Sequence, residues 1–119
     1  MKKSILKDKG KQFALRIVRL YKHLCSEKHE WVMSKQLLRS GTSIGANIAE
    51  AFYAESELDF VHKLAIAQKE DGETIYWLEL LYDSDYLTDK EFESMNTDAV
   101  EIMKLLTSSI KTVKEKLNH

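Results

Sequence analysis

Apolar residues recur along the chain every three or four positions, which is the period of an α-helix. In the first segment Phe13, Ile17, Leu20 and Leu24 are separated by four, three and four residues and therefore share one helix face. Comparable patterns recur in three later segments. The sequence therefore predicts four helices, which cover about residues 4–29, 34–53, 56–83 and 88–118.

Short polar side chains stand where three of these helices should begin. Ser34 and Ser56 are placed to cap the second and third helices, and Thr88 followed by Glu91 forms a capping box for the fourth. The predicted loops are short, so consecutive helices must run antiparallel. We expect residues 1–119 to form one domain, an all-α antiparallel up-down-up-down four-helix bundle.

The second helix contains a ridge of small residues, Gly41, Gly45 and Ala49, at intervals of four. A glycine inside a helix costs about 1 kcal/mol relative to alanine. A close approach by another helix would offset that cost, so we interpret the ridge as a helix-packing surface. A phosphate-binding loop is a poor alternative, because no strand precedes these glycines and no Gly-Lys-Ser/Thr follows them.

Composition agrees with a helical protein, since 119 residues include four glycines and no proline. Hydrophobic residues make up 44% and charged residues 31%, as in a folded, soluble protein. No apolar run is long enough to cross a bilayer, and none near Met1 resembles a signal peptide. Cys25 is the single cysteine and can form no internal disulfide, which fits a reducing compartment. We therefore expect a cytoplasmic protein without a membrane partner.

Charge is strongly segregated although the net charge is only −1. Residues 1–23 hold eight Lys and Arg against one Asp, whereas residues 50–101 hold fifteen acids against three Lys. The two regions can neutralise each other within a bundle or between copies, or the basic region can bind nucleic acid. The candidate phosphate contacts are Lys2, Lys3, Lys7, Lys9, Lys11, Arg16, Arg19 and Lys22.

Signals for catalysis or metal binding are weak. A di-iron bundle needs Glu-x-x-His on two helices, and the nearest sequence is Asp59-x-x-His62, which has no counterpart. Cys25 lies on an apolar stripe, where a buried, inert thiol is the usual state. We expect no catalytic residue, no metal and no cofactor.

Two features of the third helix are unusual. Asp71 falls on its apolar face, so either the helix turns to release it or it meets a donor such as Ser40, Asn47 or Arg39. Large apolar residues also lie off the main core face. In a monomer they would be exposed, which suggests a contact with other copies of the chain. This candidate interface comprises Ile66, Glu70, Glu73, Trp77 and Leu80.

Two stretches resemble the signature helices of a bacterial family. Residues 34–51, SKQLLRSGTSIGANIAEA, resemble the second helix of the four helix bundle proteins, also called 23S rRNA intervening-sequence proteins. Residues 59–81, with Asp59-Phe60, Lys69-Glu70, Glu73-Thr74 and YWLELL, are similar to the third helix. Tyr86-Leu87 matches a weaker element. Gly45 stands where many relatives have proline, and Gly72 is unusual for the family.

The resemblance implies a bundle that assembles into a ring, most often a homopentamer, and it implies no enzymatic activity. It also implies kinship with the accessory protein of diversity-generating retroelements, a basic pentamer that binds nucleic acid and a reverse transcriptase. This chain departs from that protein in its net charge of −1. Two functions therefore stay open: a nucleic-acid or ribonucleoprotein accessory module that binds RNA or DNA, and a scaffold that binds another protein.

Overall fold

The computed structural model describes the backbone of residues 2–118 and the side chains of residues 5–118. It contains four helices: α1 (Lys2–Ser26), α2 (Met33–Ala51), α3 (Glu57–Asp83) and α4 (Asp89–Leu117). The predicted all-α four-helix bundle is confirmed, and every helix begins and ends within three residues of its expected position. The side chains of Lys2 and Lys3, two of the predicted phosphate contacts, lie outside the described part.

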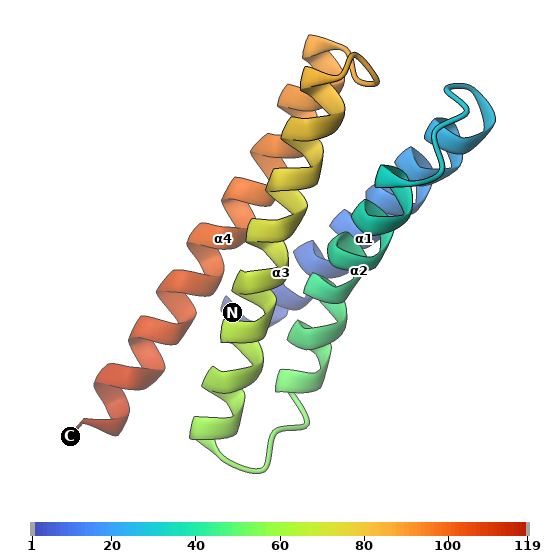
Figure 1. Ribbon diagram of the computed structural model, residues 1–119. Coiled ribbons are helices and arrows are strands. Elements are labelled where there is room, and N and C mark those ends of the chain that lie inside the picture. The colour runs from blue at the N-terminus through green and yellow to red at the C-terminus, as the bar shows by residue number, and fades with distance from the viewer. Residues whose placement is uncertain (1, 119) are drawn as a thin grey trace.

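Each helix packs against its two neighbours in a square bundle of 52 × 22 × 21 Å. The packed pairs are α1–α2, α2–α3, α3–α4 and α1–α4, of which α1–α4 is the least extensive. Figure 1 shows the α1–α2 and α3–α4 loops at one end of the bundle and the α2–α3 loop at the other. Helices α1 and α3 are therefore diagonal to each other, and their outer faces point in opposite directions.

The core is a continuous column of apolar side chains from all four helices. Phe13, Ile17 and Leu24 of α1 are at most 1% exposed, as the sequence pattern predicts. They meet Leu37, Ile44 and Ile48 of α2, Leu64, Leu78 and Leu81 of α3, and Ala99, Ile102 and Leu106 of α4.

Two of the three predicted helix caps are present. Ser56 Oγ accepts a hydrogen bond from the Asp59 backbone N–H at 3.1 Å. Thr88 and Glu91 form the complete capping box at the start of α4. These short polar contacts satisfy backbone N–H groups that have no partner within the helix.

The predicted cap of α2 by Ser34 is wrong. Ser34 lies inside the helix, is completely buried, and donates its hydroxyl to the Glu30 carbonyl at 2.7 Å. The Glu30 carboxylate instead accepts from the backbone N–H groups of Val32, Met33 and Ser34 at 3.1, 3.0 and 2.7 Å. One carboxylate therefore satisfies three donors at the helix terminus, where the helix dipole also favours a negative charge.

Helices α1 and α2 come close enough for their backbones to touch. A Cβ atom on Gly45 would lie 2.8 Å from the Gly10 carbonyl oxygen, and one on Gly41 would lie 2.7 Å from Ile17 Cγ1. Gly10, whose role the sequence analysis missed, faces the Gly45 Cα atom across the contact. A side chain at Gly45 would meet rigid backbone, so this glycine allows the close packing.

We expect Gly45→Ala to lower the free energy of unfolding by about 1–3 kcal/mol, because the new methyl group forces the two backbones apart. The measurement is denaturant unfolding at low protein concentration. Gly72→Ala is the matched control, since no atom lies within 4 Å of its added Cβ atom. This control should be as stable as the native chain or up to about 1 kcal/mol more stable. Equal stability of the Gly45→Ala and native chains would contradict the close contact.

Glu30→Ala should lower the free energy of unfolding by about 1–2 kcal/mol, because three N–H groups lose their acceptor. Burial alone would raise the pKa of Glu30, but the backbone hydrogen bonds from Met33, Ser34 and Val32 outweigh it, and the net pKa lies below its ordinary value. A lowered folded-state pKa stabilises the fold above the ordinary pKa, and this contribution is lost as pH falls. The cost of Glu30→Ala should therefore shrink in acid, and a cost independent of pH would contradict this role.

Candidate nucleic-acid interface

The predicted basic residues of α1 fall into two groups. Lys9 and Arg16 face α4, where Lys9 Nζ lies 2.9 Å from Glu101 and Arg16 Nη1 lies 2.6 Å from Asp98. Arg16 also donates to Ser94 Oγ at 2.7 Å. Acidic side chains in the amino-terminal half of α4 therefore neutralise these two cations, in agreement with the alternative that opposite charges pair within the bundle.

The second group points away from the bundle. Lys7, Lys11, Arg19 and Lys22 are exposed, and none of them forms an ion pair with a residue that the structure describes. Their spacing of four, eight and three residues keeps them on the outer half of α1. These four cations, together called the α1 cation row, form an unpaired basic strip on the surface.

One end of the row borders a hollow of about 460 Å³ between α1 and α2. Its walls include the charged residues Lys7, Asp8 and Lys11 and several small residues, among them Gly45 and Ala49. The hollow lies beside the Gly10–Gly45 contact, where the residues of α2 that face outward are small and leave space uncovered. Lys7 Nζ lies 5.5 Å from the centre of the Phe52 ring, which fixes its position by a cation–π contact.

Arg19 borders a second hollow, of about 280 Å³, between α1 and α4. Leu20 and Met95 form its apolar part, and Arg16, His23 and Glu91 complete the lining. His23 Nε2 is 3.9 Å from Glu91. This hollow contains charges of both signs, as does the α1–α2 hollow, where Asp8 lies beside the two lysines.

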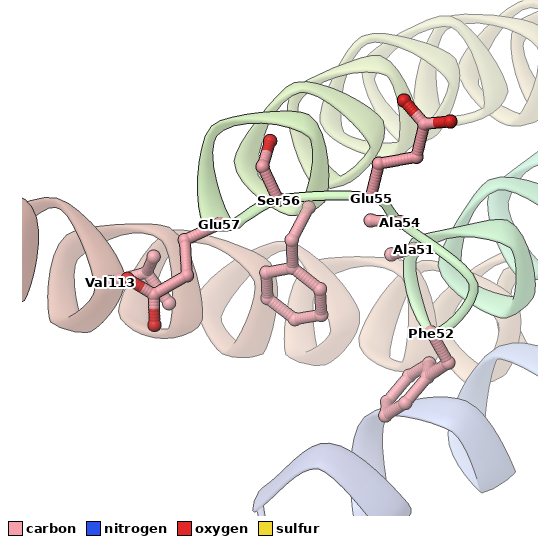
Figure 2. Close-up of a pocket in the computed structure, with 8 residues that line it drawn as sticks. Ala51, Phe52, Ala54, Glu55, Ser56, Glu57 and Val113 are labelled. Atoms are coloured by element: carbon pink, nitrogen blue, oxygen red, sulfur yellow. The ribbon is translucent and has the colours of Figure 1, made fainter.

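Another hollow, of about 330 Å³, lies at the end of the bundle where α2 turns into α3 (Figure 2). Ala51, Ala54 and Val113 contribute apolar surface, and Glu55 and Glu57 contribute acidic groups. Figure 2 shows Phe52 pointing from the end of α2 toward α1. Lys116 Nζ lies 3.0 Å from Glu57. Acidic walls repel phosphate, so this hollow has no place in a nucleic-acid interface.

The predicted oligomer interface on α3 is less exposed than expected. Ile66, Trp77 and Leu80 are each half-buried within a single chain, and Trp77 packs against the core. Trp77 Nε1 donates to Glu73 at 2.9 Å, and Arg39 of α2 pairs with both Glu70 and Glu73. One chain therefore covers much of this surface, and its role in assembly stays a prediction.

Large exposed apolar side chains outside this set were missed, and three of them lie in loops. Trp31 and Val32, in the loop before α2, are 58% and 76% exposed, and Tyr53 is 84% exposed at the other end of the bundle. They belong to loops, so helical periodicity gave no information on their direction. The sequence offered one signal for Trp31, which is that an aromatic residue stands close to the predicted start of a helix.

Asp71 is fully buried, and both its carboxylate oxygens lack a hydrogen-bond partner among the described residues. Neither predicted solution is present. Ser40 accepts from Thr74 at 2.9 Å, Asn47 donates to the Ser43 carbonyl at 2.8 Å, and Arg39 is held by the two glutamates. Burial raises the pKa of Asp71 to about 7.

Residues 5–118 contain no group of three or more His, Cys, Asp or Glu that could hold a metal ion. Cys25 is half-buried, and its Sγ atom lies 3.9 Å from Ser34 Oγ. Within the described residues, no helix is both long and apolar enough to cross a membrane. The surface features that remain are the α1 cation row, the hollows and the exposed apolar residues.

These observations define an all-α four-helix bundle protein whose distinctive features are charged and apolar surfaces. Residues 2–108 match the family model of the 23S rRNA-intervening sequence protein, so the chain belongs to that family. A crystal structure of a protein with unknown function from the S23 ribosomal protein family of Bacteroides thetaiotaomicron VPI-5482 is 59% identical to it. That structure matches with a TM-score of 0.92 over 93% of this chain and 99% of its own. No protein of curated function matches.

The buried Asp71 predicts a fold that is less stable in alkaline solution. Its pKa is about 7 in the folded state and has an ordinary value of 3.8. The folded state therefore holds more protons between these values, and stability falls as pH rises through them. At about pH 8, Asp71→Leu should raise the free energy of unfolding by about 1–4 kcal/mol, and the gain should shrink toward about pH 4.

Asp71→Asn is the control, because it keeps the shape of the side chain but cannot titrate. Denaturant unfolding across this pH range should give a smaller pH dependence for Asp71→Asn than for the native chain. Identical pH dependence in the two proteins would contradict a raised pKa at Asp71.

Proposed function

We propose that this protein is a non-enzymatic accessory module that binds RNA or DNA through the phosphate backbone. The observation that supports the proposal is the α1 cation row, which is exposed and makes no ion pair with the described residues. Surface cations that contact phosphates displace the counterions condensed on the nucleic acid, and this release provides most of the affinity in non-specific binding.

The chemistry of the row favours binding without sequence preference. Lys7, Lys11 and Lys22 present ammonium groups, which contact phosphate oxygens as point charges. No aromatic side chain is interleaved along the exposed face of α1, so stacking of bases on this surface is not expected. The hollow beside Lys7 and Lys11 has walls of small residues and one carboxylate, Asp8, so its lining has one more positive than negative group.

Assembly would strengthen this binding. The resemblance to a ring-forming family leads us to propose a homo-oligomer, with a pentamer as the expected size. Such an oligomer carries several copies of the α1 cation row. Weak contacts from each copy then add through effective concentration. The half-buried set around Trp77 remains our candidate contact between subunits of such a ring.

A scaffold that binds another protein is the second candidate. Trp31 and Val32 are exposed side by side at the α1–α2 loop, and Glu30 holds the following backbone rigid. Exposed tryptophan is enriched at the centres of protein interfaces. A function as a protein scaffold requires no contribution from the α1 cation row.

Replacing Lys7, Lys11, Arg19 and Lys22 together by Gln should weaken binding to mixed-sequence RNA and DNA by about tenfold or more at low salt. Binding of the native chain should also fall steeply between about 50 and 200 mM salt, and the variant should show a shallower dependence. Fluorescence anisotropy with labelled oligonucleotides measures both effects.

The matched control replaces four α4 lysines by Gln, which changes the net charge by the same amount: Lys104, Lys111, Lys114 and Lys116. This variant should retain most of the affinity. Equal losses in the two variants would show that net charge alone matters and would reject the named surface. No binding by the native chain at low salt would reject the nucleic-acid function and favour the protein scaffold.

A further inference from the structure

The hollow between α1 and α4, called the α1–α4 hollow, has an apolar part that is built into the bundle. Met95 belongs to the core and is 4% exposed, and the half-buried Leu20 packs against the same core. The hollow, of about 280 Å³, opens where the packing of α1 against α4 is the least extensive in the bundle. It therefore offers fixed apolar surface to a flat group that approaches from solvent.

Arg16, which lines this hollow, holds its guanidinium group in one position. Its two terminal nitrogens donate to Asp98 Oδ2 at 2.6 Å, to Ser94 Oγ at 2.7 Å and to the Ser94 carbonyl at 3.3 Å. A guanidinium plane stacks on aromatic rings and on nucleic-acid bases. Because α4 already fixes this plane, stacking on it costs little further side-chain entropy.

Glu91 supplies a hydrogen-bond acceptor at the same hollow, and it is also held in place. Its Oε1 atom accepts the Thr88 backbone N–H at 2.9 Å in the capping box of α4. Its Oε2 atom lies 3.9 Å from His23 Nε2, which is too long for a hydrogen bond. No described residue donates a hydrogen bond to Oε2, so this oxygen is available to a ligand that carries an N–H group.

These groups fit a nucleobase better than a phosphate. A phosphate group has only acceptors, and the Glu91 carboxylate would repel it. A base combines flat faces with an edge that carries both hydrogen-bond donors and acceptors, so it can use the apolar part, the Arg16 plane and the Glu91 oxygen together. Arg19 of the α1 cation row lines the same hollow, so a phosphate held by Arg19 carries its base to the opening.

We propose that the α1–α4 hollow receives one unpaired base of a single-stranded RNA or DNA whose phosphates lie along the α1 cation row. This role rests on the proposed nucleic-acid binding and names the form of nucleic acid that fits it best. A base in a duplex is paired and stacked, so it would first have to leave its helix to enter the hollow. Single strands therefore gain a contact that duplexes do not.

Fluorescence anisotropy of the full-length chain with three labelled probes of equal length tests this role. The probes are a mixed-sequence single strand, the corresponding duplex, and an abasic strand that has the same phosphates without bases. Phosphate contacts alone favour the duplex, which has the higher charge density. We expect the single strand to bind about tenfold more tightly than the abasic strand, and at least as tightly as the duplex, at low salt.

Two variants of the hollow should lower the ratio of single-strand to duplex affinity, each by about fivefold. Arg16→Lys keeps the positive charge beside Asp98 but removes the guanidinium plane. Glu91→Gln keeps the cap of α4, since glutamine also serves at this position of a capping box, and it replaces the free acceptor by a donor. Loss of the Glu91 charge by itself would strengthen binding to both probes, so a selective loss for the single strand reports on the base.

Lys9→Arg is the matched control, because it makes the reverse exchange on the same side of α1, at the ion pair with Glu101. Lys9 lies outside the lining of the α1–α4 hollow, so this variant should leave the ratio unchanged. The circular dichroism spectra of all three variants should stay helical.

Each failure has a distinct meaning. Equal affinity for the single strand and the abasic strand would overturn base binding and leave phosphate binding by the α1 cation row intact. A native ratio that persists in both Arg16→Lys and Glu91→Gln, or that falls equally in Lys9→Arg, would overturn the hollow as the site. Absence of binding to all three probes at low salt would overturn the proposed function and this role together.

Discussion

The contact between the Gly10 and Gly45 backbones determines how α1 and α2 lie, and much of the surface depends on it. Two helices that meet at glycine can pack closer than helices separated by larger side chains. The close approach lets Ile17 occupy the space beside Gly41. It also leaves a hollow with walls of small residues on the outside, where Lys7 and Lys11 stand over the junction. A single packing constraint thus shapes both the core and the candidate interface.

The side of α1 that faces α4 is held partly by ion pairs and not by a close contact between backbones. Its packing against α4 is the least extensive in the bundle, and ion pairs from Lys9 and Arg16 cross the gap. These pairs are partly exposed, and exposed ion pairs contribute little to stability and are weakened by salt. Helix α1 is therefore held more firmly by α2 than by α4, and salt should weaken the ion pairs of the α1–α4 contact.

The four helices, the core column and two caps could be predicted because periodicity and capping are local properties of the sequence. The division of the α1 cations into paired and unpaired groups could not, because Glu101 and Asp98 are far away in sequence and only tertiary packing brings them to α1. The cap by Glu30 was missed because a glutamate four residues before a serine is not a standard cap. The direction of Trp31 depends on loop geometry, about which periodicity says nothing.

Asp71 shows the same limit in the core. Its place on the apolar face followed from the helical repeat, but the donors suggested for it are occupied by Thr74, Ser43 and two glutamates. Which of several candidate partners a buried group finds depends on distances of a few tenths of an ångström. The pattern of residues along the sequence does not determine those distances.

The diagonal arrangement of α1 and α3 has a geometric consequence. The face that carries the α1 cation row and the outer face of α3 lie on opposite corners of the bundle and point in opposite directions. A molecule bound along α1 would therefore leave the outer face of α3 open.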